Sequence, residues 1–193
     1  FARTATIKAS SEVDSITKRD KLIDYYKYIC FGDGPKISVI EDIDDRPGFG
    51  AFWGEINTTI HNGLGIKGVV TNGAIRDLGM LSPGFQVLAG GIMPSHAFVC
   101  VEDTEIEVNI YGMSVCHNDL IHADLHGAVV IPHEIVENLP KAILSCNSNG
   151  DYIKNIKTFN ELEKSGLKEI LITLHPAKNT SWTRHYAEKS IKR

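Results

Sequence analysis

An arginine and an aspartate stand side by side at Arg76-Asp77, after the apolar run 68–70 and the turn-prone pair Asn72-Gly73. Arginine offers a planar, permanently charged fork for a carboxylate or a keto oxygen, and aspartate offers a hard oxygen ligand for Mg²⁺ or Mn²⁺. The pattern predicts a strand-to-helix turn, where α/β proteins commonly present ligand-binding groups. Adjacent residues on a helix do not face each other, so no intrahelical salt bridge is expected. The residues leave two interpretations, a metal-and-anion site or a solvated surface pair.

A second candidate is Glu55, which follows Gly54 at the predicted start of a short helix. A carboxylate suits the positive end of the helix dipole. The free N–H groups of Ile56 and Asn57 would also make an anion site there. The competing interpretation is that Glu55 only caps the helix.

A third pattern, H-x-D-x-H at residues 122–126, has metal-ligand residue types at every second position. On one continuous strand these side chains would share a face and form a three-ligand cluster. The competing interpretation is a hairpin with its turn at 124–127, which would stop the side chains from converging. The hairpin is the preferred interpretation.

The elements that must position these groups follow from apolar periodicity and from Gly and Pro breaks. We expect a strand over 1–9, an amphipathic helix over 12–30 and a strand in "PKISVIED". The helix is predicted to carry an apolar stripe made of Val13, Ile16, Ile23, Tyr26 and Ile29. Further β-type runs are expected in "KGVVTNG", "FQVLAGG", "HAFVCVED", "TEIEVNIYG", "MSVCHNDLIHA" and "GAVVIP". Interleaved helices and strands followed by mostly strands predict a mixed α/β or α+β domain.

The end of the chain is expected to be more helical. Pro132 is predicted to open a helix that Pro140 interrupts or kinks. We expect another helix over 159–166, a strand or helix over 167–175, and a polar, basic tail over 176–193 that serves as a docking arm.

Composition limits the classes of protein that are plausible. The 193 residues suit one domain, 1–193, with 42% hydrophobic and 23% charged residues. A net charge of −4 argues against non-specific binding to nucleic acid or anionic membrane. No apolar run approaches the ~20 residues that a membrane helix needs. Because the chain starts at Phe1 and has no methionine before Met80, we expect that an N-terminal segment is missing.

Four cysteines, at positions 30, 100, 116 and 146, lie far apart without a C-x-x-C pair, so zinc-ribbon spacing is absent. Cys100 and Cys116 have apolar neighbours and are expected to be small core residues. This usage favours a reducing, cytoplasmic compartment, although an even number of cysteines leaves disulfides open.

Two stretches, "WGEINTTIHNGLGIKGVVTNGAIRDLG" and "GMSVCHNDLIHADLHGAVVIP", resemble the family of 4-hydroxy-4-methyl-2-oxoglutarate aldolases and regulator-of-ribonuclease-activity-A-like proteins. The family pattern has an acid, twenty intervening residues and then Arg-Asp, as Glu55 and Arg76-Asp77 do here. Its later run carries D-x-x-G and I-P elements, and it is matched by Asp119, Asp124, Gly127 and Pro132. The opening "ARTATI" is similar to the family's early strand, so the resemblance covers about residues 2–145.

The chain departs from the family pattern at several points. Glu55 stands where the aldolases usually have the shorter aspartate, and "HND" replaces the usual "PGD". The helices that normally precede "ARTATI" are absent, and the extension over 155–193 matches nothing in the pattern.

The resemblance implies a β-rich α/β sandwich with covering helices, similar to swivelling domains and to the regulator of ribonuclease activity A fold. It also implies a homotrimer, or a hexamer made of two trimers, with active sites in clefts between neighbouring subunits. Asp77 would then bind Mg²⁺ (or Mn²⁺), Arg76 and the amides of Ile56 and Asn57 would hold a small 2-keto acid, and Glu55 would orient a metal-bound water.

The implied chemistry agrees with these residue types. Retro-aldol cleavage of a 4-hydroxy-2-oxo acid and decarboxylation of oxaloacetate both pass through a pyruvate enolate, which a divalent cation and Arg76 would stabilise. Glu55 would help to take the hydroxyl proton of the substrate. The expectation is therefore a metal-dependent, class II-type pyruvate aldolase or oxaloacetate decarboxylase. The alternatives are a non-catalytic protein-binding regulator, similar to the inhibitors of an RNA-degrading enzyme, and a structural trimer with a relic site.

Overall fold

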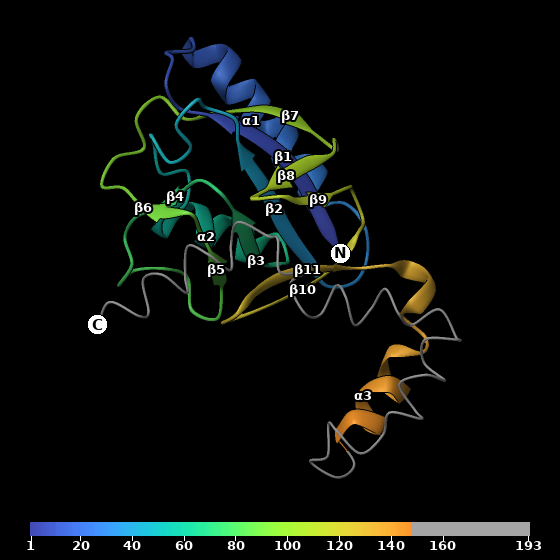
Figure 1. Ribbon diagram of the computed structural model, residues 1–193. Coiled ribbons are helices and arrows are strands. Elements are labelled where there is room, and N and C mark those ends of the chain that lie inside the picture. Colours follow the sequence, from blue (N-terminus) through green and yellow to red (C-terminus); the bar gives the residue numbers. More distant parts are fainter. Residues whose placement is uncertain (148–193) are drawn as a thin grey trace, which may run out of the picture. The chain divides into compact units, whose positions relative to one another are not determined.

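The computed structural model describes residues 1–147 (Figure 1). The chain divides into two compact units, Phe1–Ala128 and Val129–Arg193, which are described separately. The first unit contains all five candidate site residues. The expectations for 159–166, 167–175 and 176–193 lie outside the described residues, and the expectation of a single domain stays a prediction.

A five-stranded sheet in the order β5-β3-β2-β1-β7 forms the centre of the first unit. β1 (Ala2–Lys8), β2 (Lys36–Asp42), β3 (Ile66–Thr71) and β5 (Gln86–Leu88) are mutually parallel, whereas β7 (Cys100–Thr104) runs antiparallel to β1. β2 and β3 are short, mainly apolar runs bounded by Gly, Pro or acidic residues, as the sequence predicts. The parallel strands end at one edge of the sheet, from which the loops toward the candidate site depart.

Two helices and a two-stranded ribbon cover this sheet. α1 (Ser15–Cys30) packs on β7 and β1, and α2 (Glu55–Gly63) packs on β3. The ribbon of β8 (Val108–Ile110) and β9 (Met113–Val115) lies against β2 and β1.

Alternate residues of the sheet point to opposite faces, and both faces are buried. Ile40 and Val69 belong to the hydrophobic cluster that includes Tyr25 and Ile29 of α1, while their neighbours Val39 and Val70 are buried as well. The molecule is therefore a β-rich α/β sandwich with covering helices, which confirms the expected fold class.

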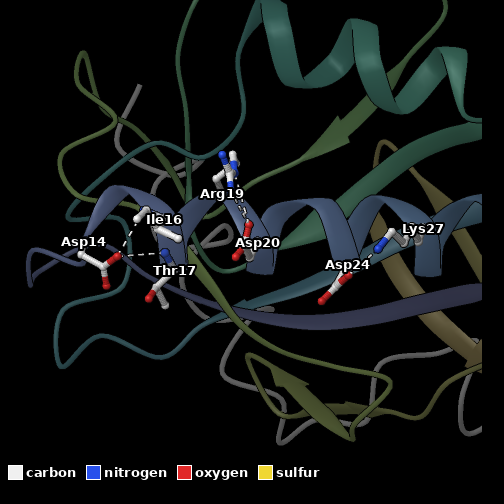
Figure 2. Close-up of polar contacts among 7 residues, drawn as sticks. All are labelled: Asp14, Ile16, Thr17, Arg19, Asp20, Asp24 and Lys27. Carbon is white, nitrogen blue, oxygen red and sulfur yellow. Dashed lines mark hydrogen bonds and ion pairs between the residues drawn. The ribbon is translucent and has the colours of Figure 1, made fainter.

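Helix α1 begins later than the periodicity predicts. The helix starts at Ser15, and not at residue 12, because the Asp14 carboxylate caps it by accepting hydrogen bonds from Ile16 N (3.1 Å) and Thr17 N (2.9 Å). Figure 2 shows this cap together with two ion pairs on the exposed surface of α1, Arg19–Asp20 and Asp24–Lys27. Exposed pairs of this kind contribute little to stability.

The predicted apolar stripe of α1 is partly wrong. Ile16 and Ile23 are 63% and 43% exposed, whereas Tyr25 and Ile29 are fully buried. The sequence offers apolar residues all around this helix, so periodicity alone does not select one face. Tertiary partners decide it, because the buried Tyr25 hydroxyl lies within hydrogen-bond distance of Ser38 Oγ (3.3 Å) and His61 Nε2 (2.8 Å).

The remaining strands form short ribbons. β4 (Ala74–Ile75) pairs in parallel with β6 (Gly91–Ile92). β10 (Leu120–Asp124) and β11 (Gly127–Ile131) form a two-stranded sheet. The run expected over 113–123 is thus two strands, β9 and β10, because Asp119 Oδ2 accepts the N–H of Cys116 in a turn between them (2.7 Å). Cys116 is exposed and not a core residue, while Cys100 is buried as expected.

The second unit begins within β11 and continues with a short 3₁₀ helix, η1 (His133–Ile135), and with α3 (Leu139–Asn147). Pro140 lies in the first turn of α3, where a missing N–H is tolerated. The break between the helices therefore precedes Pro140, in contrast to the expected interruption at that residue. Within residues 1–147 no helix is long and apolar enough to span a membrane.

Candidate functional site

Arg76 and Asp77 directly follow β4, in a turn and not at the start of a helix. Asp77 has a φ of 56°, a left-handed conformation that aspartate tolerates better than most residues. Its carbonyl accepts the N–H of Met80 (2.8 Å), which closes the turn. The expected helix after Asp77 is thus wrong, and the helix that completes the site is α2.

The side chains of Arg76 and Asp77 contact each other. Arg76 Nε lies 3.3 Å from Asp77 Oδ2, and the N–H of Glu55 donates to the same oxygen (3.2 Å). Adjacent charged residues do not face each other on a helix, but the backbone at Asp77 is not helical, and so the two side chains can meet. Among the described residues no hydrogen bond or ion pair engages Asp77 Oδ1, so one carboxylate oxygen is available to a ligand.

Gly54 allows this close approach. A Cβ built on Gly54 would lie 2.5 Å from Asp77 Oδ2 and 3.0 Å from Arg76 Cγ, both well inside van der Waals contact. The residue is the N-cap of α2 and has an ordinary extended φ of −174°. Glycine is therefore required here for space and not for backbone freedom.

A backbone link joins the two halves of the site. Trp53 pairs with Ile75 in an isolated parallel bridge, and the N–H of Arg76 donates to the Trp53 carbonyl (2.9 Å). Because Trp53 is fully buried, this link holds the start of α2 against the Arg76-Asp77 turn.

The amino end of α2 presents backbone donors beside the carboxylate. The first hydrogen bond within the helix runs from Thr58 N to the Gly54 carbonyl (3.0 Å), so the N–H groups of Ile56 and Asn57 have no acceptor inside the helix. The Glu55 side chain is exposed at the same helix start. The structure thus brings all five predicted site residues to one place, and their roles there stay predictions.

Asn57 also fixes the helix to its surroundings. Its side-chain N–H₂ donates to the Phe52 carbonyl, and its Oδ1 accepts from the Tyr26 hydroxyl (3.0 Å). The Asn57 carbonyl accepts from His61 Nδ1 (2.6 Å), which places the ring proton on that nitrogen. His61 Nε2 then accepts from the Tyr25 hydroxyl. Burial lowers the pKa of His61 to about 4, so this histidine is a neutral packing residue against Trp53.

On its other side, Arg76 borders a pocket. Its Nη1 donates to the Ala51 carbonyl (2.9 Å), and its side chain is 20% exposed. The pocket encloses about 160 Å³ and is lined by Lys18, Leu22, Phe52, Asn57, Arg76, His96, Val99, Cys100 and Val101. This pocket could not be predicted from local sequence patterns, because its walls come from four separate segments: α1, the start of α2 with the loop before it, Arg76, and the start of β7 with the loop before it.

The H-x-D-x-H pattern spans the β10–β11 hairpin. His122 and Asp124 lie on β10, and the turn places His126 beyond it, where its N–H donates to Asp124 Oδ1 (2.7 Å). Both histidine rings lie near Asp124, with nitrogen–oxygen distances of 3.7 and 3.4 Å. The hairpin prediction is confirmed, and within the described residues no group of three or more His, Cys, Asp or Glu could hold a metal ion.

The residues around Asp77 fit a Mg²⁺ or Mn²⁺ site of the open kind. Mg²⁺ is usually held by one or two carboxylates and keeps several waters, which are exchanged for substrate oxygens. Asp77 offers one such carboxylate, with Oδ1 available and the side chain 35% exposed. Most of the coordination sphere would be left for water, substrate or a neighbouring subunit.

Comparison with known proteins places the chain in a family. No curated protein matches the sequence significantly. A solved structure described as one of novel cellulases from microbes associated with the gut ecosystem has a TM-score of 0.63 and 18% identity, over 79% of this chain and 67% of that chain. The RraAS2 protein of Streptomyces coelicolor, described as an unusual member of the RNase ES inhibitor RraA family, has a TM-score of 0.61 and 19% identity, over 80% and 74% of the two chains. An uncharacterised protein from Pseudomonas syringae has a TM-score of 0.54 and 21% identity, over 86% and 73%.

These likenesses show the fold, and a sequence-family match is more specific. The model of the RraA-like family, described as Aldolase/RraA, matches residues 5–130, which include the whole candidate site. Since this match spans well over half of the chain, the protein belongs to the RraA-like (Aldolase/RraA) family.

Proposed function

We propose that the protein is a divalent-metal-dependent lyase that acts on a small 2-keto acid. The reaction is retro-aldol cleavage of a 4-hydroxy-2-oxo acid, decarboxylation of oxaloacetate, or both. Membership of a family that includes aldolases supports the reaction class. The observation that carries the proposal is the convergence of the Asp77 carboxylate, the Arg76 guanidinium and the amino end of α2 around Gly54.

Asp77 would hold the cation, Mg²⁺ or Mn²⁺, through its available oxygen. When bound, the cation supplies a Lewis acid for the keto oxygen of the substrate. The protein's contribution is to keep this carboxylate in one position, which the Glu55 N–H and Arg76 Nε do through Oδ2.

Arg76 and the helix start hold the substrate. The N–H groups of Ile56 and Asn57 point from the positive end of α2 and suit the carboxylate of the 2-keto acid. Arg76 places a permanent positive charge where negative charge develops on the reacting carbonyl. Glu55, exposed beside them, takes the proton of the C4 hydroxyl as the C3–C4 bond breaks in the retro-aldol direction.

The surface around the site supports assembly with further copies of the chain. Three large apolar side chains near the site are exposed: Ile56 by 65%, Leu78 by 55% and Met80 by 60%. Large exposed apolar side chains mark an interface where they form a continuous patch. A homotrimer, or a pair of trimers, would bury them and bring a neighbour's residues to the cleft. The proposal keeps the cytoplasmic location inferred from cysteine usage.

Release of pyruvate tests the proposed activity. The purified chain is incubated in Mg²⁺ with 4-hydroxy-4-methyl-2-oxoglutarate and, separately, with oxaloacetate, and pyruvate is measured against an enzyme-free control. Pyruvate formation above that control supports the lyase. Absence of turnover of both substrates, with Mg²⁺ and Mn²⁺ each tried, contradicts it.

A second candidate function is a non-catalytic regulator that binds an RNA-degrading enzyme. The fold shared with RraAS2, described as belonging to an RNase inhibitor family, is what supports it. The retained carboxylate of Asp77, held beside an arginine, favours chemistry over this alternative. Inhibition of an RNA-degrading enzyme by a chain that releases no pyruvate would favour the regulator.

A further inference from the structure

The pocket beside Arg76 has an uneven distribution of charge. Three of its lining side chains carry positive charge or can acquire it: Lys18, Arg76 and His96. None of the described residues that line it is acidic, and the rest of the wall is apolar apart from Asn57 and Cys100. The Asn57 amide is already engaged with Phe52 and Tyr26. An anion with a short apolar stem is the ligand that this lining fits.

Lys18 differs from the other cations of α1. Arg19, Lys21 and Lys27 each have a carboxylate partner within 3.0 Å: Asp20, Glu102 and Asp24 respectively. Figure 2 shows two of these pairs, Arg19–Asp20 and Asp24–Lys27. Lys18 has no ion-pair partner among residues 1–147, although it is half-buried at the pocket wall. An ammonium group at a pocket wall that has no counter-ion in the protein can form a charge-assisted hydrogen bond with an external anion.

Arg76 connects this pocket to the candidate site. Its Nε faces Asp77, while its Nη1 donates to the Ala51 carbonyl and its side chain forms part of the pocket wall. If a ligand is held at Asp77 by its 2-keto acid group, the pocket therefore lies next to that ligand, on the other side of the Arg76 guanidinium. A volume of about 160 Å³ admits a few carbon atoms and a carboxylate.

We propose that Lys18 is a specificity-determining residue, which binds a second carboxylate on the far half of the substrate in the pocket beside Arg76. The apolar part of the wall accommodates the methylene groups between the two ends. This inference rests on the proposed function, because it assumes that the 2-keto acid end is held at Asp77. It predicts a preference for substrates whose leaving half is charged.

The test compares two ligands that differ only at the far end. 2-Oxoglutarate ends in a carboxylate and 2-oxopentanoate ends in a methyl group, and neither is cleaved in the proposed reaction. Calorimetric titration in Mg²⁺ should show that the wild-type chain binds 2-oxoglutarate more tightly. Lys18→Met should weaken 2-oxoglutarate binding about tenfold, the loss expected for one charge-assisted hydrogen bond, and leave 2-oxopentanoate binding within about twofold. Lys18→Arg, which keeps the charge, should retain the preference.

Lys27→Met is the matched control, because it removes a lysine from the same helix but outside the pocket. It should leave both affinities unchanged. The proposal is overturned if wild type shows no preference, if Lys18→Met weakens both ligands equally, or if Lys18→Met has no effect. The binding assay does not require turnover, so it tests the role of Lys18 separately from the lyase activity. A chain that releases no pyruvate but prefers 2-oxoglutarate through Lys18 would contradict the proposed lyase function and support the proposed role of the pocket.

Discussion

Two carboxylates lie at the amino end of α2, and their surroundings suit different tasks. The Asp77 carboxylate is fixed through Oδ2 by the Glu55 N–H and by Arg76. The Glu55 side chain is exposed and has no hydrogen bond or ion pair with any residue in the described part of the chain. A fixed carboxylate suits a metal ligand, because ligand positions must be maintained. An exposed, unpaired one suits proton transfer, because it must approach and leave the substrate.

The first prediction separates proton transfer by Glu55 from simple helix capping. Glu55→Gln should lower kcat for cleavage of 4-hydroxy-4-methyl-2-oxoglutarate about 100-fold, because the amide cannot accept the hydroxyl proton. Pyruvate affinity should stay within about twofold, since Arg76 and the backbone amides do the binding. Glu55→Asp should keep most of the activity. If Glu55 only caps α2, Glu55→Gln should lower the free energy of unfolding by about 0.5 kcal/mol and leave kcat unchanged.

The second prediction concerns the geometry of Arg76. Its Nε faces Asp77 while Nη1 reaches the Ala51 carbonyl, and lysine has one nitrogen and cannot make both contacts. Arg76→Lys should therefore lower kcat/KM about 100-fold although the charge is kept. Arg19→Lys, at an exposed pair on α1, is the control and should have no effect. Equal activity of the Arg76→Lys variant and wild type would show that catalysis does not require the two separate guanidinium contacts.

At the scale of elements, the site depends on how closely α2 approaches the Arg76-Asp77 turn. The Trp53–Ile75 bridge joins the two segments, and Gly54 leaves room for the Asp77 carboxylate. The contact joins distant parts of the sequence. Trp53 and Ile75, more than twenty positions apart, must pair before the Asp77 carboxylate can reach the start of α2.

The third prediction follows from the space above Gly54. Gly54→Ala would place a methyl group 2.5 Å from the present position of Asp77 Oδ2, so the carboxylate must move. We expect Mn²⁺ affinity and activity both to fall at least about tenfold, with the far-ultraviolet circular dichroism unchanged. Gly63→Ala is the matched control in the same helix, since a Cβ there meets nothing within 4 Å. Full Mn²⁺ affinity in Gly54→Ala would mean that Asp77 is not the ligand.

Local patterns predicted α2 and the strands of the main sheet well. Short, mainly apolar runs between strong breaks define β2 and β3, alternating residues define β1, and Gly54-Glu55 marks the start of α2. The missing helix after Asp77 had a signal in the sequence, since Gly79 and Pro83 both oppose helix formation. The buried face of α1 had no such signal, because it is set by contacts with distant residues.

The candidate site was predictable in its residues but not in its arrangement. Spacing and residue type selected Glu55, Arg76 and Asp77, and the structure brings them together. The importance of Gly54 and Lys18 was not predictable. Gly54 matters through a contact with a residue far along the chain, and Lys18 through a pocket that four separate segments build.

The fourth prediction concerns the packing of α1 on α2 through His61. The pKa of this histidine falls from 6.5 to about 4 because burial disfavours the charged ring. As pH falls, the unfolded chain therefore takes up a proton on His61 at a higher pH than the folded chain does. The contribution of the neutral, buried ring to the free energy of unfolding is complete above pH 6.5 and is lost as pH falls toward 4. The loss amounts to about 3 kcal/mol. Urea unfolding at pH 7 and pH 4.5 should show a smaller pH dependence in His61→Gln than in wild type. An identical dependence would contradict the buried, neutral histidine.

At the scale of the whole molecule, family membership and fold agree while activity is a separate question. The family match covers 5–130, and all residues of the candidate site and of the Lys18 pocket lie within that range. The shared fold with an inhibitor-family protein means that the fold alone does not select an activity. The site chemistry has to decide, and the proposed lyase needs the Asp77 carboxylate as its metal ligand.

The most direct measurement is the rate of pyruvate release from oxaloacetate by wild type and by Asp77→Asn, each in Mg²⁺ and in EDTA, with the enzyme-free rate subtracted. Asparagine keeps the size of the side chain and tolerates the positive φ of 56°, so the fold should be retained. We predict that EDTA abolishes the wild-type rate, that Mg²⁺ restores it, and that Asp77→Asn in Mg²⁺ is slower by about 100-fold or more. A wild-type rate that is unaffected by EDTA, or an Asp77→Asn variant as fast as wild type in Mg²⁺, would contradict the assignment of Asp77 as the metal ligand of a lyase.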